Sequence, residues 1–202
     1  MTKLWLGLQE KYDVSVWKFF VGLPPDHKAI EMFCDTVVTM AENNSTTPSE
    51  GMVLALQQAR HAATRGEVPV GAVLLDAQGH VLAQAGNRVE ELHDPSAHAE
   101  MLVMREAVRQ RHGQRLADCT LVVSLEPCPM CAAAMAHFRV GRLVFGAYDP
   151  KGGAVEHGPR LPYRAEALHR PDIVGGVREQ EAARLLKQFF LALRSKDPSG
   201  PA

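Results

Sequence analysis

Apolar positions after about residue 49 follow two regular periods, which predict the helices and strands of one α/β domain. The first helix should begin at Ser49, which can act as its N-cap, and end at residues 65–67. The apolar run of residues 68–75 predicts a strand, and a turn over residues 76–79 joins it to a return strand over residues 80–87. These two strands are therefore expected to form a β-hairpin.

The rest of this region continues to alternate between helices and strands. After a polar loop over residues 88–96, the pattern predicts a helix that starts near His98, a strand over 120–125, a helix to about 138, a strand over 142–148 and a terminal helix over 179–194. Two strands joined by a helix usually lie parallel, with a right-handed crossover. The sequence thus predicts a parallel unit within a sheet that is covered by helices on both faces.

Residues 1–49 differ from the rest of the chain. They contain both tryptophans, an apolar stretch that suggests a short helix over residues 29–40, and a polar linker over residues 41–49. No candidate chemistry lies in this segment, which could be a docking appendage or could precede a true start at Met40. We therefore predict three parts: an N-terminal extension over 1–49, partly disordered, a folded domain over 50–196 that carries the candidate chemistry, and a disordered tail over 197–202.

Composition mainly excludes some classes of protein. Hydrophobic residues make up 46% of the chain, which is ample for a core, and the net charge of −1 lacks the basic excess of a general nucleic-acid binder. No apolar run reaches the length of a membrane span, and the first eight residues make a poor signal peptide. Cys34 and Cys119 are expected to be reduced thiols, so a cytoplasmic protein fits best.

The strongest chemical signal is His98-Ala99-Glu100 followed by Pro127-Cys128-Pro129-Met130-Cys131. One imidazole and two thiolates give zinc three protein ligands and leave a fourth position for water, which can ionise near neutral pH. Glu100 is not needed as a ligand and can move protons between that water and a substrate. Both cysteines should ionise readily at a helix start. His-x-Glu with a later Pro-Cys-x-x-Cys is the signature of zinc-dependent deaminases.

Each half of this motif has another reading when it stands alone. A Cys-x-x-Cys pair in a cytosolic protein can be a redox pair or part of a structural zinc site. A closed structural site would need a fourth ligand, which Cys119 or His93 could offer. A single histidine near a helix start is more often structural. The presence of both halves, in this order and spacing, favours the deaminase.

The chain also resembles the bacterial tRNA-specific adenosine deaminases, which belong to the cytidine deaminase-like superfamily. The resemblance covers about residues 50–195, roughly three quarters of the chain, and is carried by residues 68–73, 86–88, 94–100, 125–131, 144–147 and 149–154. It implies a three-layer α/β/α fold with a central mixed five-stranded sheet, and a homodimer. It also implies one Zn²⁺ per subunit and conversion of adenosine to inosine at the wobble position of an arginine tRNA.

The resemblance assigns roles to the motif residues. His98, Cys128 and Cys131 would bind the zinc ion. Glu100 would take a proton from the zinc-bound water and deliver it to the purine ring and then to the leaving ammonia. The target base lies in the single-stranded loop of the anticodon stem-loop, so it can be turned out into a pocket without breaking a duplex.

Substrate contacts are implied less specifically. Asn87 resembles the amide that hydrogen-bonds the inserted nucleoside, although a turn asparagine at a strand end reads the same way locally. Val70 and Pro69 resemble residues that line the base pocket, although by pattern they are strand positions. Phe189 and Phe190 can be read as core residues or as RNA contacts, because the family's following arginines are missing here.

Two rival functions stay open. The same zinc chemistry could act on a free base or nucleoside, such as guanine, cytosine or cytidine, because pocket shape and flanking contacts choose the substrate. Residues 86–88 and 144–147 favour the tRNA interpretation. A non-catalytic zinc-binding subunit is the second rival, and it would have no need of Glu100.

Overall fold

The computed structural model describes residues 45–113 and 115–196. The helix predicted over residues 29–40, the first part of the predicted linker (residues 41–44) and the predicted tail over residues 197–202 lie outside the described residues. None of the described helices combines the length and the hydropathy that a transmembrane helix requires.

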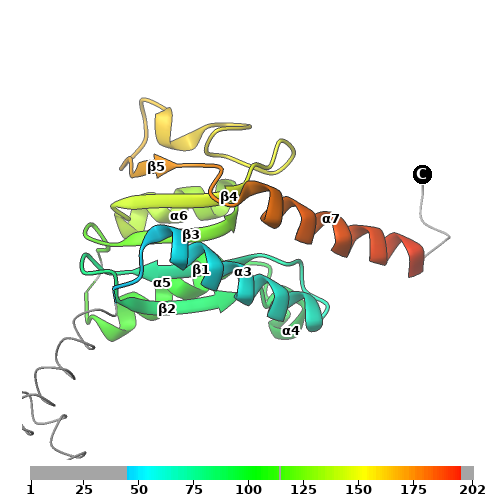
Figure 1. Ribbon diagram of the computed structural model, residues 1–202. Helices are drawn as coiled ribbons and strands as arrows, with labels where there is room; N and C mark the ends of the chain where they lie inside the picture. Colours follow the sequence, from blue (N-terminus) through cyan, green and yellow to red (C-terminus); the bar gives the residue numbers. More distant parts are fainter. Residues whose placement is uncertain (1–44, 114, 197–202) are drawn as a thin grey trace, which may run out of the picture. The chain divides into compact units, whose positions relative to one another are not determined.

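A mixed five-stranded sheet forms the centre of the described fold (Figure 1). Its spatial order is β2-β1-β3-β4-β5, with β1 antiparallel to both β2 and β3, and with β3, β4 and β5 parallel to one another. The strands are β1 (Gly71–Leu75), β2 (Val81–Gly86), β3 (Thr120–Leu125), β4 (Arg142–Ala147) and β5 (Asp172–Val174). The predicted hairpin, the parallel unit and the five-stranded mixed sheet are all confirmed.

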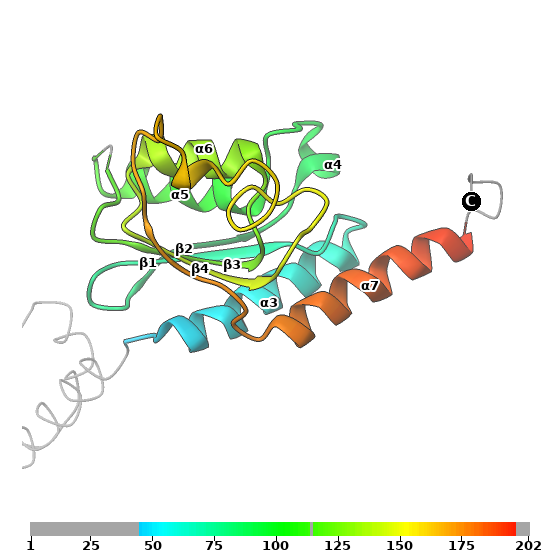
Figure 2. The ribbon, with the colours of Figure 1, turned by 90° about the horizontal axis from the view of Figure 1, so that it is seen from above.

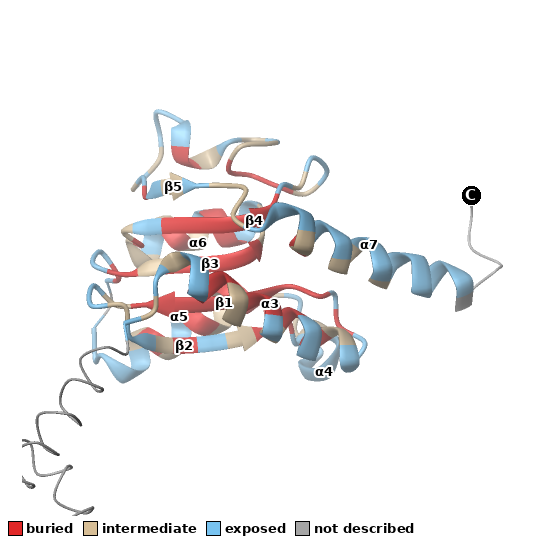
Figure 3. Ribbon diagram, viewed as in Figure 1, coloured by how far each residue is buried: buried red, intermediate tan, exposed pale blue. Residues whose placement is uncertain are grey.

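Helices cover both faces of this sheet, as predicted (Figure 2). The helices are α3 (Pro48–Thr64), α4 (Val89–Leu92), α5 (Ala99–Gln110), α6 (Pro129–Phe138) and α7 (Glu179–Lys196), with a short 3-10 helix η2 (Leu161–Tyr163). Helices α5 and α6 pack on one face, while α3 and the first part of α7 pack on the other. The sheet and the inner sides of the helices are buried, whereas the later turns of α7 are exposed (Figure 3).

Strand β1 is apolar throughout because both of its faces are buried. Every residue of β1 is buried, and neighbouring side chains belong to different core clusters. Leu74 and Leu121 pack on the α5 and α6 side, whereas Val73 and Val122 pack on the α3 side. A strand covered on both faces has no polar alternation, and this explains the continuous apolar runs in the sequence.

Some predicted boundaries are wrong, for local reasons. Helix α3 is capped by Thr47 and not by Ser49: the Thr47 hydroxyl accepts from the amide of Glu50, whose carboxylate accepts from the amide of Thr47. The predicted strand over 68–75 begins only at Gly71, because Pro69 has no amide hydrogen to donate.

Two short elements escaped the periodic pattern. Helix α4 lies inside the predicted polar loop over residues 88–96, and β5 has only three residues. Neither is long enough to show a period, so both depend on contacts with the rest of the fold.

Close packing of α3 on the hairpin fixes the edge of the sheet near the motif residues. A β-carbon at Gly71 would lie 2.1 Å from the carbonyl oxygen of Ala55, and one at Gly86 would lie 2.5 Å from that of Gln58. Only glycine allows the backbones to approach this closely. Val70 and Asn87, which adjoin the two glycines, are joined by a hydrogen bond from the Asn87 amide to the Val70 carbonyl.

Candidate active site

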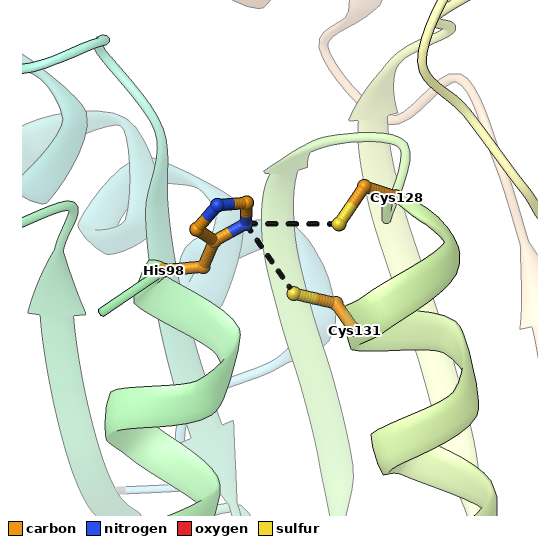
Figure 4. Close-up of side chains that lie close together, drawn as sticks. All are labelled: His98, Cys128 and Cys131. Atoms are coloured by element: carbon orange, nitrogen blue, oxygen red, sulfur yellow. Dashed lines mark hydrogen bonds between the residues drawn. The ribbon is translucent and has the colours of Figure 1, made fainter. Parts of the chain in front are cut away.

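The three predicted metal ligands meet where two helices begin (Figure 4). His98 is the N-cap residue of α5, Cys128 is the N-cap residue of α6, and Cys131 lies in the first turn of α6. Pro129 occupies the first turn of α6, as the sequence predicted. The loop between β3 and α6 carries Cys128 across to His98, so residues far apart in the chain form one group.

The spacing of the donor atoms fits a tetrahedral zinc ion. The Nδ1 atom of His98 lies 3.7 Å from the Cys128 sulfur and 3.6 Å from the Cys131 sulfur, and all three donor atoms lie within 4.8 Å of one another. Tetrahedral bonds of about 2.0 Å to nitrogen and about 2.3 Å to sulfur place these atoms about 3.6 Å apart. The three residues can therefore hold zinc without rearrangement.

The group has three protein ligands in the described part of the chain, which leaves one position open. Cys119 lies directly before β3, at the opposite end of that strand from Cys128, and its sulfur accepts from Arg111. His93 is exposed at the end of α4. Neither belongs to the group of possible metal ligands, so the closed structural site considered from the sequence is not formed.

Electrostatics at the group differ from the sequence prediction in one respect. The hydrogen bond from Cys131, helped by His98, lowers the pKa of Cys128 to about 4. The same hydrogen bond, together with burial, raises the pKa of Cys131, so the prediction that both cysteines ionise readily holds for Cys128 alone. The Cys128 sulfur also raises the pKa of His98. A bound cation would favour the thiolate form of both sulfurs.

Glu100 lies beside this group without joining it. Burial raises the pKa of its carboxyl group, and the nearby Cys128 sulfur acts in the same direction. Its Oε2 atom is buried and is the one such side-chain nitrogen or oxygen, among the described residues, without a hydrogen-bond partner. A buried oxygen left free at a metal group suits exchange of protons with a small molecule bound there.

A cavity of about 420 Å³ opens over the group and carries most of the predicted substrate residues. Val70 and Asn87 line it, together with His98, Glu100 and Cys128. Pro69 is buried but does not line the cavity. A volume of this order holds a nucleoside-sized ligand.

Asn87 presents a defined donor to this cavity. Its side-chain oxygen accepts from the amide of Ala99 in the first turn of α5, at 3.0 Å. Its own carbonyl accepts from Arg65. Because the amide oxygen is engaged, the NH₂ group is the part of Asn87 left to bind a ligand. The Asn87 side chain therefore also fixes the start of α5.

The aromatic pair of α7 borders the same cavity. Phe189 is half-buried and Phe190 is 42% exposed, with the two rings edge to face at 5.4 Å. Both residues line the cavity, as does Leu193 one turn later. Neither ring is buried in the core, so the interpretation of Phe189 and Phe190 as core residues is excluded.

Sequence reasoning missed Glu126, which organises one wall of the cavity. Its buried carboxylate accepts from the amides of Asp149, Val155, Glu156 and His157 and contacts the His157 ring, at distances between 2.8 and 3.1 Å. Burial alone would raise the pKa of this carboxyl group, but the surrounding donors outweigh it and lower the pKa. One signal in the sequence could have revealed this role: Glu126 is an acidic residue that stands between a predicted buried strand and Pro127-Cys128.

Comparison with known proteins agrees with this geometry. The family model of the cytidine and deoxycytidylate deaminase zinc-binding region matches residues 45–147, which include all four motif residues. The tRNA-specific adenosine deaminase of Agrobacterium fabrum is 49% identical over 146 residues, which cover 72% of this chain and 95% of that protein.

Solved structures give the same picture. A structure from studies of A-to-I editing by tRNA:A34 deaminases at the wobble position of transfer RNA is 49% identical, with a TM-score of 0.66, and covers 67% of this chain and 98% of that chain. Guanine deaminase from Nitrosomonas europaea is 25% identical, with a TM-score of 0.62, and covers 85% and 95%. The chain therefore belongs to the zinc-binding cytidine and deoxycytidylate deaminase family and, within it, to the tRNA-specific adenosine deaminases.

Proposed function

We propose that this protein is a zinc-dependent tRNA adenosine deaminase that converts adenosine to inosine at the wobble position of an arginine tRNA. The observation that carries the proposal is an open His98, Cys128 and Cys131 group beside the buried carboxylate of Glu100, whose Oε2 atom has no hydrogen-bond partner among the described residues. The 49% identity to the tRNA-specific adenosine deaminase of Agrobacterium fabrum supports tRNA as the substrate.

His98, Cys128 and Cys131 would hold one Zn²⁺ per subunit, and zinc supplies the Lewis acidity that makes water a nucleophile near neutral pH. Glu100 then transfers the protons of the reaction. It takes one proton from the water that attacks carbon 6 of the purine and gives it to ring nitrogen 1; it then takes the second proton from the hydroxyl now on carbon 6 and gives it to the departing amine. A carbon–oxygen bond forms, the carbon–nitrogen bond breaks, and ammonia leaves.

The substrate side of the proposal uses the cavity wall. The NH₂ group of Asn87 would donate to the inserted nucleoside, and Val70 would pack against the base. Pro69 would act by shaping the segment that leads into Val70, since it does not line the cavity. The single-stranded anticodon loop supplies a base that can enter such a pocket.

We also propose limits for the domains, an oligomeric state and a cellular location. Residues 50–196 would form the deaminase domain, residues 1–49 an extension and residues 197–202 a tail. The protein would form a homodimer in the cytoplasm. This homodimer would act on the anticodon stem-loop of the tRNA.

Deamination of a free base is the rival that the comparisons weaken most. Guanine deaminase from Nitrosomonas europaea is similar in fold, but its identity to this chain is 25%, about half that of the tRNA:A34 deaminase structure. The rival of a non-catalytic zinc subunit is disfavoured by Glu100, because burying an unpaired carboxylate costs free energy that such a subunit would not need to spend.

Incubation of the zinc-loaded protein with an arginine anticodon stem-loop that carries a wobble adenosine tests the proposal. Inosine should appear at that one position, as measured by digestion of the RNA and mass spectrometry. Guanine, cytosine and cytidine serve as competing substrates in parallel reactions. Turnover of one of these without any inosine in the RNA would overturn the proposal.

A further inference from the structure

A second groove lies between α3 and the first half of α7, and the proposed reaction does not use it. The two helices contact each other and lie side by side on one face of the sheet (Figure 2). The groove has a volume of about 410 Å³, and all but one of its lining residues are polar: Arg60, Gln180, Glu181, Arg184, Leu185 and Gln188. A hollow of this composition suits a polar or charged ligand.

The groove carries an excess of positive charge, although the whole chain has a net charge of −1. Glu181 is the one acid among its lining residues, and two arginines share it: Oε1 accepts from Arg60 at 2.6 Å, and Oε2 accepts from Arg178 at 2.9 Å. Arg184 is exposed and forms no ion pair with any described residue. Because a guanidinium group stays charged, the groove retains positive charge for a ligand.

The groups left free in the groove are mainly hydrogen-bond donors. A guanidinium group donates and cannot accept, and Arg60 uses only Nη2 for Glu181. Gln180 and Gln188 are exposed and each add a side-chain NH₂ group. A matching ligand has negative charge and several acceptor oxygens. Phosphate has both, and arginine binds it with two parallel hydrogen bonds.

Helix α7 connects this groove to the active-site cavity. Leu185 lines the groove, and Phe189, about one helical turn later, lines the cavity. Helix α3 makes the same connection on the other wall, since Arg60 lines the groove and Gly66, just past the end of the helix, lines the cavity. A strand that leaves the cavity along these two helices therefore meets the groove.

The two stretches of α7 suit the two parts of a nucleotide chain. The stretch at the cavity presents Phe189, Phe190 and Leu193, and bases pack on apolar and aromatic side chains of this kind. The stretch at the groove presents Arg184 and Gln188, which suit the backbone. An acidic peptide would use the charge of the groove but not the apolar stretch beside it. The combination favours RNA.

We infer that the groove between α3 and α7 binds the phosphate backbone of the RNA whose wobble base occupies the cavity, with Arg184 as the main contact and Arg60 as the second. The inference rests on the proposed function, which supplies the RNA. Phosphate contacts position a nucleic acid without reading its sequence, so the groove would add affinity and leave the choice of base to the cavity.

The salt dependence of RNA binding tests this groove. The probe is a fluorescein-labelled anticodon stem-loop with inosine at the wobble position, which cannot be deaminated again. Its Kd for the zinc-loaded protein follows from fluorescence anisotropy at several NaCl concentrations. The variants are Arg184→Gln, which removes a charge without breaking an ion pair, and Arg184→Lys, which keeps the charge. Arg109→Gln is the matched control, because Arg109 is 76% exposed on α5, on the opposite face of the sheet.

Arg184→Gln should weaken binding about fivefold at low salt, the upper end for an exposed ion pair. It should also reduce the slope of log Kd against log salt concentration by about one, as expected for one lost phosphate contact. Arg184→Lys should keep the slope, and Arg109→Gln should match the wild type in both respects.

A second set of stem-loops locates the contact. In each of them, one phosphate near the wobble nucleotide is replaced by an uncharged methylphosphonate. One of these replacements should weaken binding to the wild type, and Arg184→Gln should then cost nothing more, because two changes at one contact are not additive.

The outcomes separate this inference from the function on which it rests. An unchanged Kd and salt slope in Arg184→Gln would overturn the groove as a phosphate site, and so would an equal loss in Arg109→Gln. Losses that add fully with every methylphosphonate would also overturn it and would point to another occupant, such as an acidic protein. Each of these results leaves the proposed function intact if the wild type still converts the wobble adenosine. A wild type that neither binds nor deaminates the stem-loop would overturn both.

Discussion

Glu126→Gln should destabilise the protein by removing an acceptor from the wall of the active site. The carboxylate divides its partners unequally: Oε1 accepts from the amides of Val155, Glu156 and His157, while Oε2 accepts from the amide of Asp149 and contacts Nδ1 of His157. A glutamine keeps three of these bonds if its carbonyl replaces Oε1. Its NH₂ group must then face the Asp149 amide and the His157 ring.

The expected magnitude follows from this geometry. His157 can change tautomer so that Nδ1 accepts from the new NH₂ group, which relieves one conflict. The Asp149 amide cannot change, so a buried donor loses its partner, at about 1–3 kcal/mol. Glu126→Ala leaves all of these donors without an acceptor. It should lower the free energy of unfolding by about 3–5 kcal/mol, as in other broken buried charge networks.

Urea unfolding of the zinc-loaded protein, followed by far-ultraviolet circular dichroism, measures these differences. Glu166→Gln is the matched control, because Glu166 is an exposed acid of the same connecting segment and its replacement should leave the midpoint unchanged. If Glu126→Gln unfolds at the wild-type midpoint with the same slope, the carboxylate does not hold residues 149–157 and the reasoning fails.

Three further predictions concern the motif residues and the thiol of Cys119. Glu100→Gln should retain zinc but lose about 10²–10⁴-fold in kcat on the stem-loop, and turnover within tenfold of wild type would exclude the proton role. Cys128→Ala should bind no zinc at neutral pH, as measured by atomic absorption after dialysis, whereas one equivalent of metal would contradict the ligand assignment. Burial raises the pKa of Cys119 to about 11 from an ordinary value of 9.0, so the unfolded chain releases this proton first. Stability should therefore be unaffected by this group below pH 9 and should fall between pH 9 and 11, by at most about 3 kcal/mol. Cys119→Ala should have the shallower pH dependence in urea unfolding, and identical profiles would refute the shift.

Much of this protein could be predicted from its sequence because the signals are local. The helical period of residues 179–194 and the mainly apolar run of residues 120–125 each report how one segment is buried, and both elements formed with bounds within two residues of the prediction. The chemistry was equally local in kind: the zinc group follows from the affinity of imidazole and thiolate for that metal, at a spacing that a helix start imposes.

Other features were decided only when distant segments came together. Cys119 was a candidate ligand by residue type, and only its place beside Arg111, away from His98, removed it. Phe189 and Phe190 have an ordinary helical pattern, yet they border the cavity because α7 extends past the sheet.

The buried acids Glu67 and Glu126 show most clearly what only the tertiary structure decides. Charged side chains usually remain in water, so the chain near Glu67 gives no sign of its burial, and Glu126 is marked only by its place between a buried strand and Pro127-Cys128. Their partners are 24 residues away for Glu67 and 23 to 31 residues away for Glu126. The sequence by itself determined which metal chemistry this protein performs, whereas the tertiary structure decided which polar groups are left free to meet the substrate. That choice depends on how desolvated donors and acceptors are matched across the whole fold, which no local pattern encodes.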